Sequence, residues 1–287
     1  MSRTALEKLL ASDELPSGSQ AEDLVLQLEQ ALASTDPYVR EAGLTLSDRL
    51  IDRGYFSAAR LRALAERMTA NLQVGLGKTG EDSAFLRAYA VLVLFEIVGY
   101  DNRKKLLSAE TLRFVQRETI RYLLAEKDER VCDPAKGWLH AVPHAFNVLI
   151  ETAKSEALGR RDLEQILEAV LRRVRGSVTQ VYTGFEEELF ALAVVAVLRR
   201  SLLPIADFGN WAEKVTKPPE GSTSWSEHLR VPEPELILLA NLKATLRALY
   251  LQISFGDEPL PEHNIILGRI RKGLETLDTG FYNPPTV

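Results

Sequence analysis

Apolar residues recur at three- and four-residue spacing through most of the chain. This spacing is typical of amphipathic α-helices. Runs of alternating β-branched residues bounded by turn residues are almost absent, so the pattern predicts an all-α fold of about a dozen helices and no sheet. One helix start is well formed, because Asp36 is a suitable N-cap and Pro37 suits the first helical position.

Similar short apolar segments recur at intervals of about fifty residues, close to the period of two- and three-helix repeats. The matching segments begin at Glu41, Ala88, His140, Leu189 and Leu239, and Arg40 and Arg87 also occupy matching positions. We therefore expect a HEAT/armadillo-like α-solenoid, in which stacked antiparallel helix pairs bury their apolar faces against their neighbours. The expected organisation is a single helical-repeat domain over residues 1–287, with residues 1–20 forming an N-terminal helix and linker.

Two connections interrupt the helical pattern. Residues 75–81 contain glycine, lysine and threonine but lack the full spacing of a phosphate-binding loop and the strand that precedes one. Residues 216–231 form a long proline- and serine-rich loop between helices, with Trp225 and His228 as its expected anchors. Loops of this length in compact domains are often functional.

The composition argues against several partners. The formal net charge is −5, whereas nucleic acids and anionic membranes select a net or strongly clustered positive charge. The longest apolar run, residues 189–198, is about half of the length that a membrane-spanning helix needs. The single cysteine, Cys132, rules out an internal disulfide, and the first residues lack the apolar core of a signal peptide. We expect a cytoplasmic protein that binds neither nucleic acid nor membrane.

The segment from Lys136 to Asn147 carries the candidate chemistry, since it contains two of the four histidines beside a tryptophan. Asp133-Pro134 repeats the N-cap and proline pattern, which predicts a helix that begins there, runs towards Thr152 and is kinked at Pro143. A helical wheel separates two stripes. The predicted core stripe holds Trp138, Val142, Ala145 and Leu149, and the opposite stripe holds His140, His144, Asn147 and Glu151.

Histidines at positions i and i+4 can hold one metal ion, but a stable site needs a third ligand. The candidates for that ligand are Glu151, Glu187 and His228. Three interpretations stay open: a polar structural or groove-lining stripe, a non-metal ligand or catalytic site, and a metal site. The sequence predicts no metal site outright, since His140 and His144 supply only two of the ligands, and it indicates no cofactor.

Several segments resemble a bacterial family known only as a domain of unknown function, the one numbered 2785. The resemblance spans nearly the whole chain and rests on residues 86–94, 125–128, 137–144, 181–188 and 241–250, with Gly137-Trp138-Leu139-His140-Ala141-Val142-Pro143-His144 as the most specific motif. It implies an all-helical fold and no established activity. The family usually has alanine at the position of Pro143 and an acidic residue at that of Asn147. Both departures weaken a metal or acid-base interpretation, because a carboxylate at position 147 would have suited a metal ligand or a histidine partner.

Two functions compete. The first is a binding or interaction module, whose groove binds a protein segment or a small ligand. The candidate groove residues are Arg87, Trp138, His140, His144, Asn147 and Glu187. The second is a hydrolytic enzyme, with or without a metal, that uses the histidine pair with Glu187 as partner. DNA-base repair ranks last, because the chain has no net basic charge. The sequence does not decide whether the protein is an enzyme.

Overall fold

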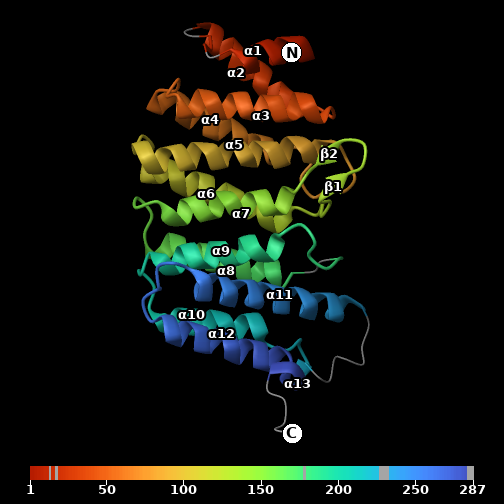
Figure 1. The fold of residues 1–287 in the computed structure, drawn as a ribbon, viewed down its shortest axis with the longest axis vertical. Helices are drawn as coiled ribbons and strands as arrows, with labels where there is room; N and C mark the ends of the chain where they lie inside the picture. Colours follow the sequence, from red (N-terminus) through yellow and green to blue (C-terminus); the bar gives the residue numbers. More distant parts are fainter. Residues whose placement is uncertain (13, 17–18, 177–178, 226–232, 283–287) are drawn as a thin grey trace. The chain divides into compact units, whose positions relative to one another are not determined.

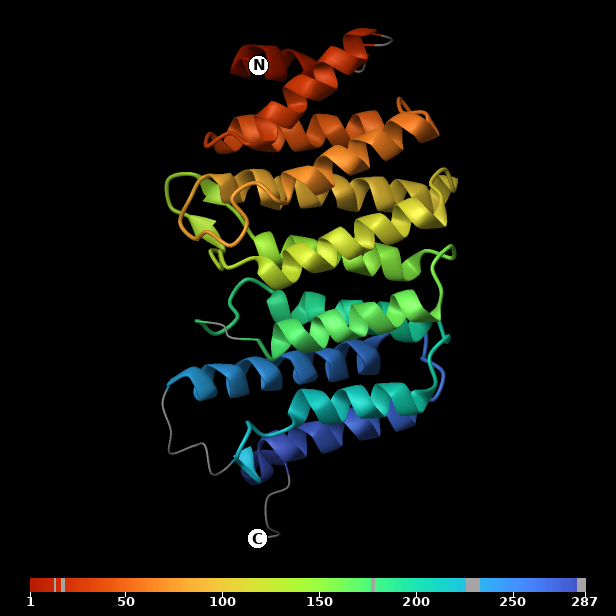
Figure 2. The same cartoon turned by 180° about the vertical axis from the view of Figure 1, so that it is seen from behind.

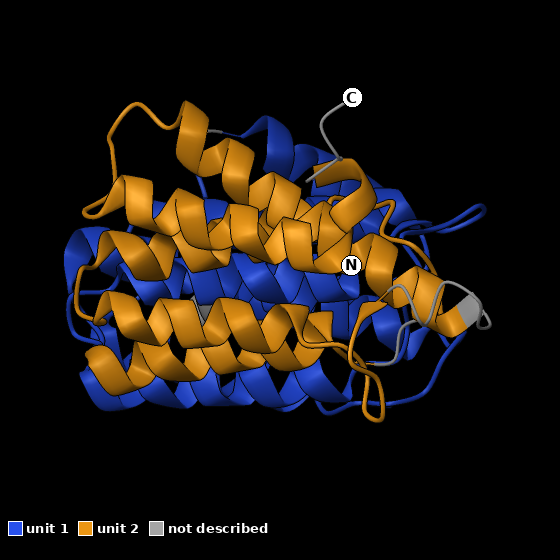
Figure 3. Ribbon diagram, turned by 90° about the horizontal axis from the view of Figure 1, so that it is seen from below, with its two compact units in different colours: residues 1–158 blue, residues 159–287 orange. Residues whose placement is uncertain are grey.

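The computed structural model describes residues 1–12, 14–16, 19–176, 179–225 and 233–282. These residues form thirteen helices and one two-stranded sheet of two residues per strand. The all-α prediction is therefore confirmed, while the expected absence of any sheet is wrong by one short hairpin. The chain divides into two compact units, residues 1–158 and 159–287 (Figure 3). The solenoid arrangement and the single domain stay predictions.

The described residues of unit 1 form seven helices and the hairpin (Figure 1). The elements are α1 (Arg3–Ala11), α2 (Ser19–Leu32), α3 (Pro37–Asp52), α4 (Ala58–Asn71), α5 (Ser83–Lys104), α6 (Ala109–Ala125), β1 (Cys132–Asp133), β2 (Gly137–Trp138) and α7 (Ala141–Lys154). Helices α3, α5 and α7 lie side by side in one layer, and α4 and α6 lie behind them (Figures 1 and 2). Helix α3 begins as predicted, because the Asp36 side chain accepts a hydrogen bond from Tyr38 N and Pro37 is the first helical residue.

Helix α5 is the centre of unit 1, since it packs against α3, α4 and α7. It is apolar on nearly all sides and most of its residues are buried, as expected of a core helix. By length and composition alone, α5 and residues 234–255 could cross a membrane. The packing of α5 inside unit 1 accounts for its apolar composition.

The hairpin replaces the first part of a predicted helix. Asp133 does not cap a helix. Its Oδ1 instead accepts hydrogen bonds from the backbone N–H groups of Ala135 and Lys136, both at 3.0 Å. This closes the tight turn between β1 and β2. Gly137 then has φ = 80°, a conformation that no α-helix contains. Helix α7 therefore begins at Ala141, and Pro143 falls in its first turn, where a missing N–H breaks no helical bond and produces no kink.

Unit 2 contains six helices among its described residues. They are α8 (Arg160–Val174), α9 (Glu186–Arg199), α10 (Ile205–Thr216), α11 (Glu233–Phe255), α12 (His263–Leu277) and α13 (Thr279–Tyr282). Helix α11 packs between α9 and α12. Trp225, one of the expected anchors of the long loop, is buried and donates its indole N–H to Thr216 O at 2.8 Å. The second expected anchor, His228, lies outside the described residues.

Candidate functional site

The histidine pair of unit 1 lies at the start of α7. His140 is the N-cap residue and has a left-handed backbone conformation, with φ = 48°. His144 lies one turn later, and its backbone N–H donates to His140 O at 3.0 Å. Both side chains are half-buried. A left-handed histidine is strained, and such strain persists only where neighbouring contacts impose it.

Trp138 is where the helical wheel was wrong. It lies in β2, before the helix, and its side chain is 55% exposed. The other three members of the predicted core stripe, Val142, Ala145 and Leu149, are buried as expected. The error follows from the hairpin, because a residue outside the helix does not share its periodicity.

Arg40 of α3 holds the backbone that carries Trp138. This arginine is fully buried, and it donates to Lys136 O at 2.6 Å and to Trp138 O at 3.4 Å. Its guanidinium carbon lies 4.2 Å from the ring centre of Phe85 and 4.8 Å from that of Tyr89, both on α5. A buried cation packed on two aromatic rings has little freedom to move. The exposed indole is therefore displayed from a fixed backbone.

Four rings follow one another from the surface inwards, and we call Trp138, His140, His144 and Tyr89 the Trp-His cluster. The ring centres are 4.9 Å apart between Trp138 and His140, 5.8 Å between His140 and His144, and 6.4 Å between His144 and Tyr89. These spacings are those of contacting aromatic rings. At the inner end the Tyr89 hydroxyl donates a hydrogen bond to the carboxylate of Glu41 on α3.

Burial shifts the pKa of two members of this cluster, His144 and Tyr89. It lowers the pKa of His144 to about 3, assisted by the neighbouring His140 and opposed by the backbone carbonyl of Ala88. It also raises the pKa of Tyr89 to about 12, and the hydrogen bond to Glu41 adds to this shift. At neutral pH His144 is therefore an uncharged imidazole and Tyr89 is a hydroxyl donor. A base with so low a pKa is poorly matched to proton abstraction at neutral pH.

The remaining predicted residues are not all brought together. Asn147 is half-buried on α7, one turn beyond His144. Arg87 is fully buried in an ion pair with Glu126, so its position has a structural explanation and its predicted ligand role stays a prediction. Glu187 is half-buried at the start of α9 in unit 2, and burial raises the pKa of its carboxyl group. Its predicted partnership with the histidines stays untested.

Neither further candidate for a third metal ligand completes the histidine pair. Glu151 lies two turns after His144 on α7, and its carboxylate binds Asn102 Nδ2 at 2.9 Å and Lys154 Nζ at 2.6 Å. His228 lies outside the described residues. Over the described part of the chain, no three His, Cys, Asp or Glu side chains are grouped so that they could hold a metal ion.

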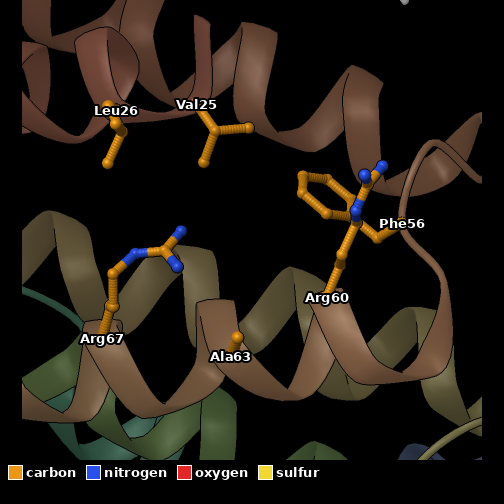
Figure 4. A pocket seen from close by; sticks show the side chains of 6 residues that line it. All are labelled: Val25, Leu26, Phe56, Arg60, Ala63 and Arg67. Atoms are coloured by element: carbon orange, nitrogen blue, oxygen red, sulfur yellow. The ribbon is translucent and has the colours of Figure 1, made fainter. Parts of the chain in front are cut away.

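A separate cavity of about 290 Å³ lies between α2 and α4 of unit 1 (Figure 4). Its lining residues are Val25, Leu26, Phe56, Arg60, Ala63 and Arg67. The guanidinium of Arg67 is engaged by Glu29 at 3.1 Å, and Leu26 is 54% exposed. None of the residues singled out from the sequence lines this cavity.

Sequence reasoning missed three parts of the Trp-His cluster and its support, namely Arg40, Glu41 and Tyr89. The matching positions of Arg40 and Arg87 were a usable signal, because an arginine on an apolar helical stripe must find acceptors inside the protein. The Tyr89–Glu41 contact had no such signal, since it depends on which helices become neighbours.

Comparison with known proteins identifies a family whose function is unknown. Residues 72–251 match the sequence model of the family described as "Protein of unknown function (DUF2785)". This span includes α5, α7, the hairpin and every candidate residue proposed for the groove. Neither the curated proteins nor the solved structures contain a significant match to the chain.

Proposed function

Since the chain belongs to the DUF2785 family of proteins of unknown function, its activity has to be inferred from its own site, and we propose that it is a binding protein. The proposed site is the Trp-His cluster of unit 1, with Asn147 at its edge. The ligand is a small molecule or a protein segment with a flat or apolar group that stacks on Trp138 and a polar group that bonds to the histidines. The proposed setting is the cytoplasm.

The exposed indole of Trp138, carried on a backbone that Arg40 holds, is the observation behind this proposal. An exposed tryptophan on a mobile loop would have to be ordered when a ligand binds, and ordering lowers affinity. Here Arg40 bonds to the carbonyl groups of Lys136 and Trp138 before any ligand arrives. Aromatic side chains that neighbouring residues hold in place are common anchors of binding sites. The left-handed backbone of His140 is consistent with this role, because strained residues concentrate at functional sites.

The alternative function is a hydrolase that uses the same histidine pair. Its support is that His140 and His144 are half-buried with ring centres 5.8 Å apart, which suits two imidazoles on one metal ion. Two features favour binding over this alternative. His144 has a pKa of about 3 and so is a weak base, and no third metal ligand joins the pair among the described residues.

The test is a screen of metabolites and peptides by thermal shift on the full chain, followed by titration of each hit. We expect ligands that raise Tm in the wild type to lose at least tenfold in affinity with Trp138→Ala. A tenfold loss corresponds to about 1.4 kcal/mol, within the range of an interface anchor. The control is Phe255→Ala, which removes an even more exposed aromatic ring in unit 2, where Phe255 is 78% exposed.

Two results would count against the proposal. Hits that bind Trp138→Ala as tightly as the wild type would place the ligand elsewhere. Near-stoichiometric zinc in purified wild-type protein, absent after the double substitution His140→Ala with His144→Ala, would favour the hydrolase. Metal content measured by plasma mass spectrometry, before and after incubation with zinc, provides that second reading.

A further inference from the structure

The cavity between α2 and α4 of unit 1 lies beside a bridge of polar side chains that joins the two helices. Glu29 of α2 accepts a hydrogen bond from Arg67 Nε at 3.1 Å and one from Asn71 Nδ2 at 2.9 Å. Arg67 and Asn71 lie one turn apart on α4, so both reach the same carboxylate. Glu29 and Arg67 are half-buried. The bridge therefore restrains the guanidinium of Arg67.

This bridge uses only one edge of the guanidinium. Among the described residues, Nε makes the only hydrogen bond of the Arg67 side chain. A guanidinium has five N–H donors in a planar fork, so its Nη1 and Nη2 edge can still bind both oxygen atoms of a carboxylate. In Figure 4 the guanidinium points into the space between the two helices, below Val25 and Leu26. The cavity therefore contains an arginine positioned to bind an anion.

The rest of the cavity suits a hydrocarbon group. Its lining includes four apolar side chains, those of Val25, Leu26, Phe56 and Ala63. In Figure 4 the Phe56 ring points into the cavity from the end opposite the guanidinium. Among the described residues, the remaining lining side chain is Arg60, a second cation. Two arginines beside an apolar surface complement an anion that has an apolar body.

The volume of the cavity limits the size of such a ligand. The cavity measures about 290 Å³, close to the lower limit of about 300 Å³ for small-molecule sites. At about 30 Å³ for each molecule of liquid water, this is the space of about ten waters. A methylene group takes a similar space, so a ligand of about ten non-hydrogen atoms, such as octanoate, matches the cavity.

We propose that this cavity binds a small carboxylate with an apolar body. The carboxylate binds Nη1 and Nη2 of Arg67, and the apolar body lies against Leu26 and Phe56. A free phosphate is less suitable, because its remaining oxygen atoms would face apolar side chains and lose their hydration. The cavity shares no residue with the Trp-His cluster and lies before the span that matches the family, residues 72–251. The inference is therefore independent of the proposed function.

Isothermal titration calorimetry of the full chain with octanoate at neutral pH tests the proposal. We expect one site with a Kd below about 1 mM. Octanol has the same tail without the charge, and acetate has the charge without the tail. Each should bind at least tenfold more weakly than octanoate, because each makes only half of the contacts. A Kd for octanoate above about 1 mM, or equal binding of octanol, would overturn the proposal.

Arg67→Met tests the predicted anion contact, because methionine removes the charge and keeps an apolar side chain. It should bind octanoate at least tenfold more weakly than the wild type does. The matched control is Arg62→Met on the same helix. Arg62 is exposed, pairs with Glu66 and does not line the cavity, so this variant should bind octanoate as the wild type does. Equal affinities of the two variants would contradict a specific contact with Arg67.

Ala63→Leu tests the cavity without a change of charge. The larger side chain occupies part of the space, so octanoate should bind at least tenfold more weakly while Tm stays level or rises. Trp138→Ala should leave octanoate binding unchanged, which separates this cavity from the Trp-His cluster. In methyl NMR spectra, octanoate should shift the signals of Val25, Leu26 and Ala63. Shifts confined to other methyl groups, or unchanged affinity in Ala63→Leu, would show that octanoate binds elsewhere.

Discussion

The buried ion pair between Arg87 and Glu126 gives the sharpest test of how unit 1 is held together. Both side chains have no exposed surface. Arg87 Nε and Nη2 donate to the two carboxylate oxygens at 2.6 and 3.0 Å, while Nη1 donates to the carbonyl groups of Val74 and Gly75. Removal of either partner leaves a charge inside the protein without its counter-ion. We therefore predict that Glu126→Gln is strongly destabilising.

The expected magnitude is about 3–5 kcal/mol, because breaking a buried pair by removing one partner leaves an uncompensated charge. The loss of a hydrogen bond between neutral groups would account for only about 1 kcal/mol of this destabilisation. The whole stability of a domain is about 5–15 kcal/mol, so the variant should be close to unfolding. The double substitution Arg87→Met with Glu126→Leu should recover part of the loss. Full recovery is not expected, because Glu126 Oε1 also accepts from the backbone N–H groups of Lys127 and Asp128.

Urea denaturation followed by circular dichroism measures the effect. With a slope of about 2 kcal/mol/M, the midpoint of the unit 1 transition should fall by about 2 M. Glu66→Gln, which breaks the exposed pair with Arg62, should leave the midpoint unchanged. A midpoint in Glu126→Gln that lies within 0.5 M of this control, a margin of about 1 kcal/mol, would refute the reasoning, since the buried charge would then be solvated by other means.

Three further outcomes are expected. Gly137→Ala should destabilise the protein by about 1–3 kcal/mol in thermal denaturation, because Gly137 has φ = 80° and an added Cβ would lie 3.2 Å from Pro37 Cβ. Gly159→Ala should cost less, because the space around Gly159 is open and only a glycine N-cap of α8 is replaced. Asp101→Ala should cost about 2 kcal/mol, since Asp101 Oδ1 accepts from the backbone N–H groups of Leu106 and Leu107, both at 2.7 Å. His144→Gln should reduce the loss of stability on acidification. Burial lowers the pKa of His144 to about 3, so on acidification the unfolded chain takes up a proton at a higher pH than the folded protein does. The free energy of unfolding therefore falls as the pH drops from 6.5 towards 3.

The fold class was predictable because helices are local. The apolar spacing and the Asp36-Pro37 start depend on residues within one or two turns, and both were confirmed. The family resemblance was confirmed as well. Asp133-Pro134 shows the limit of such signals, because aspartate caps tight turns with the same chemistry that it uses at helix starts. The glycine four residues later decides between the two, since φ = 80° at Gly137 stops a helix.

The site was only half predictable, for a different physical reason. The histidines could be found because they lie four residues apart in one segment. Their neighbours Tyr89 and Glu41 come from two other helices, and the contacts between helices are set by packing that no local pattern reveals. The exposure of Trp138 was also hidden, because tryptophan at a helical position is ordinarily buried.

Arg40 and Arg87, which occupy matching positions along the chain, differ in a way that leads to a last prediction. Both are fully buried and both donate to backbone carbonyl groups of a loop. Arg87 has a buried carboxylate partner, whereas Arg40 forms no ion pair among the described residues and packs on Phe85 and Tyr89. Replacement of Arg40 therefore leaves no carboxylate unpaired.

Arg40→Met should accordingly destabilise the protein much less than Arg87→Met, because methionine fills the space between the rings and only carbonyl groups lose their donors. Its main effect should be local. Without the bonds to the carbonyl groups of Lys136 and Trp138, the hairpin should open more often. The Leu139 amide donates to Val131 O at 3.0 Å and reports on this opening. Its hydrogen exchange should become about tenfold faster or more, and a tenfold change corresponds to about 1.4 kcal/mol. If Arg40→Met instead unfolds the protein as readily as Arg87→Met, Arg40 is a stability element of the core. If stability is kept and exchange quickens, the arginine serves chiefly to hold Trp138 in place.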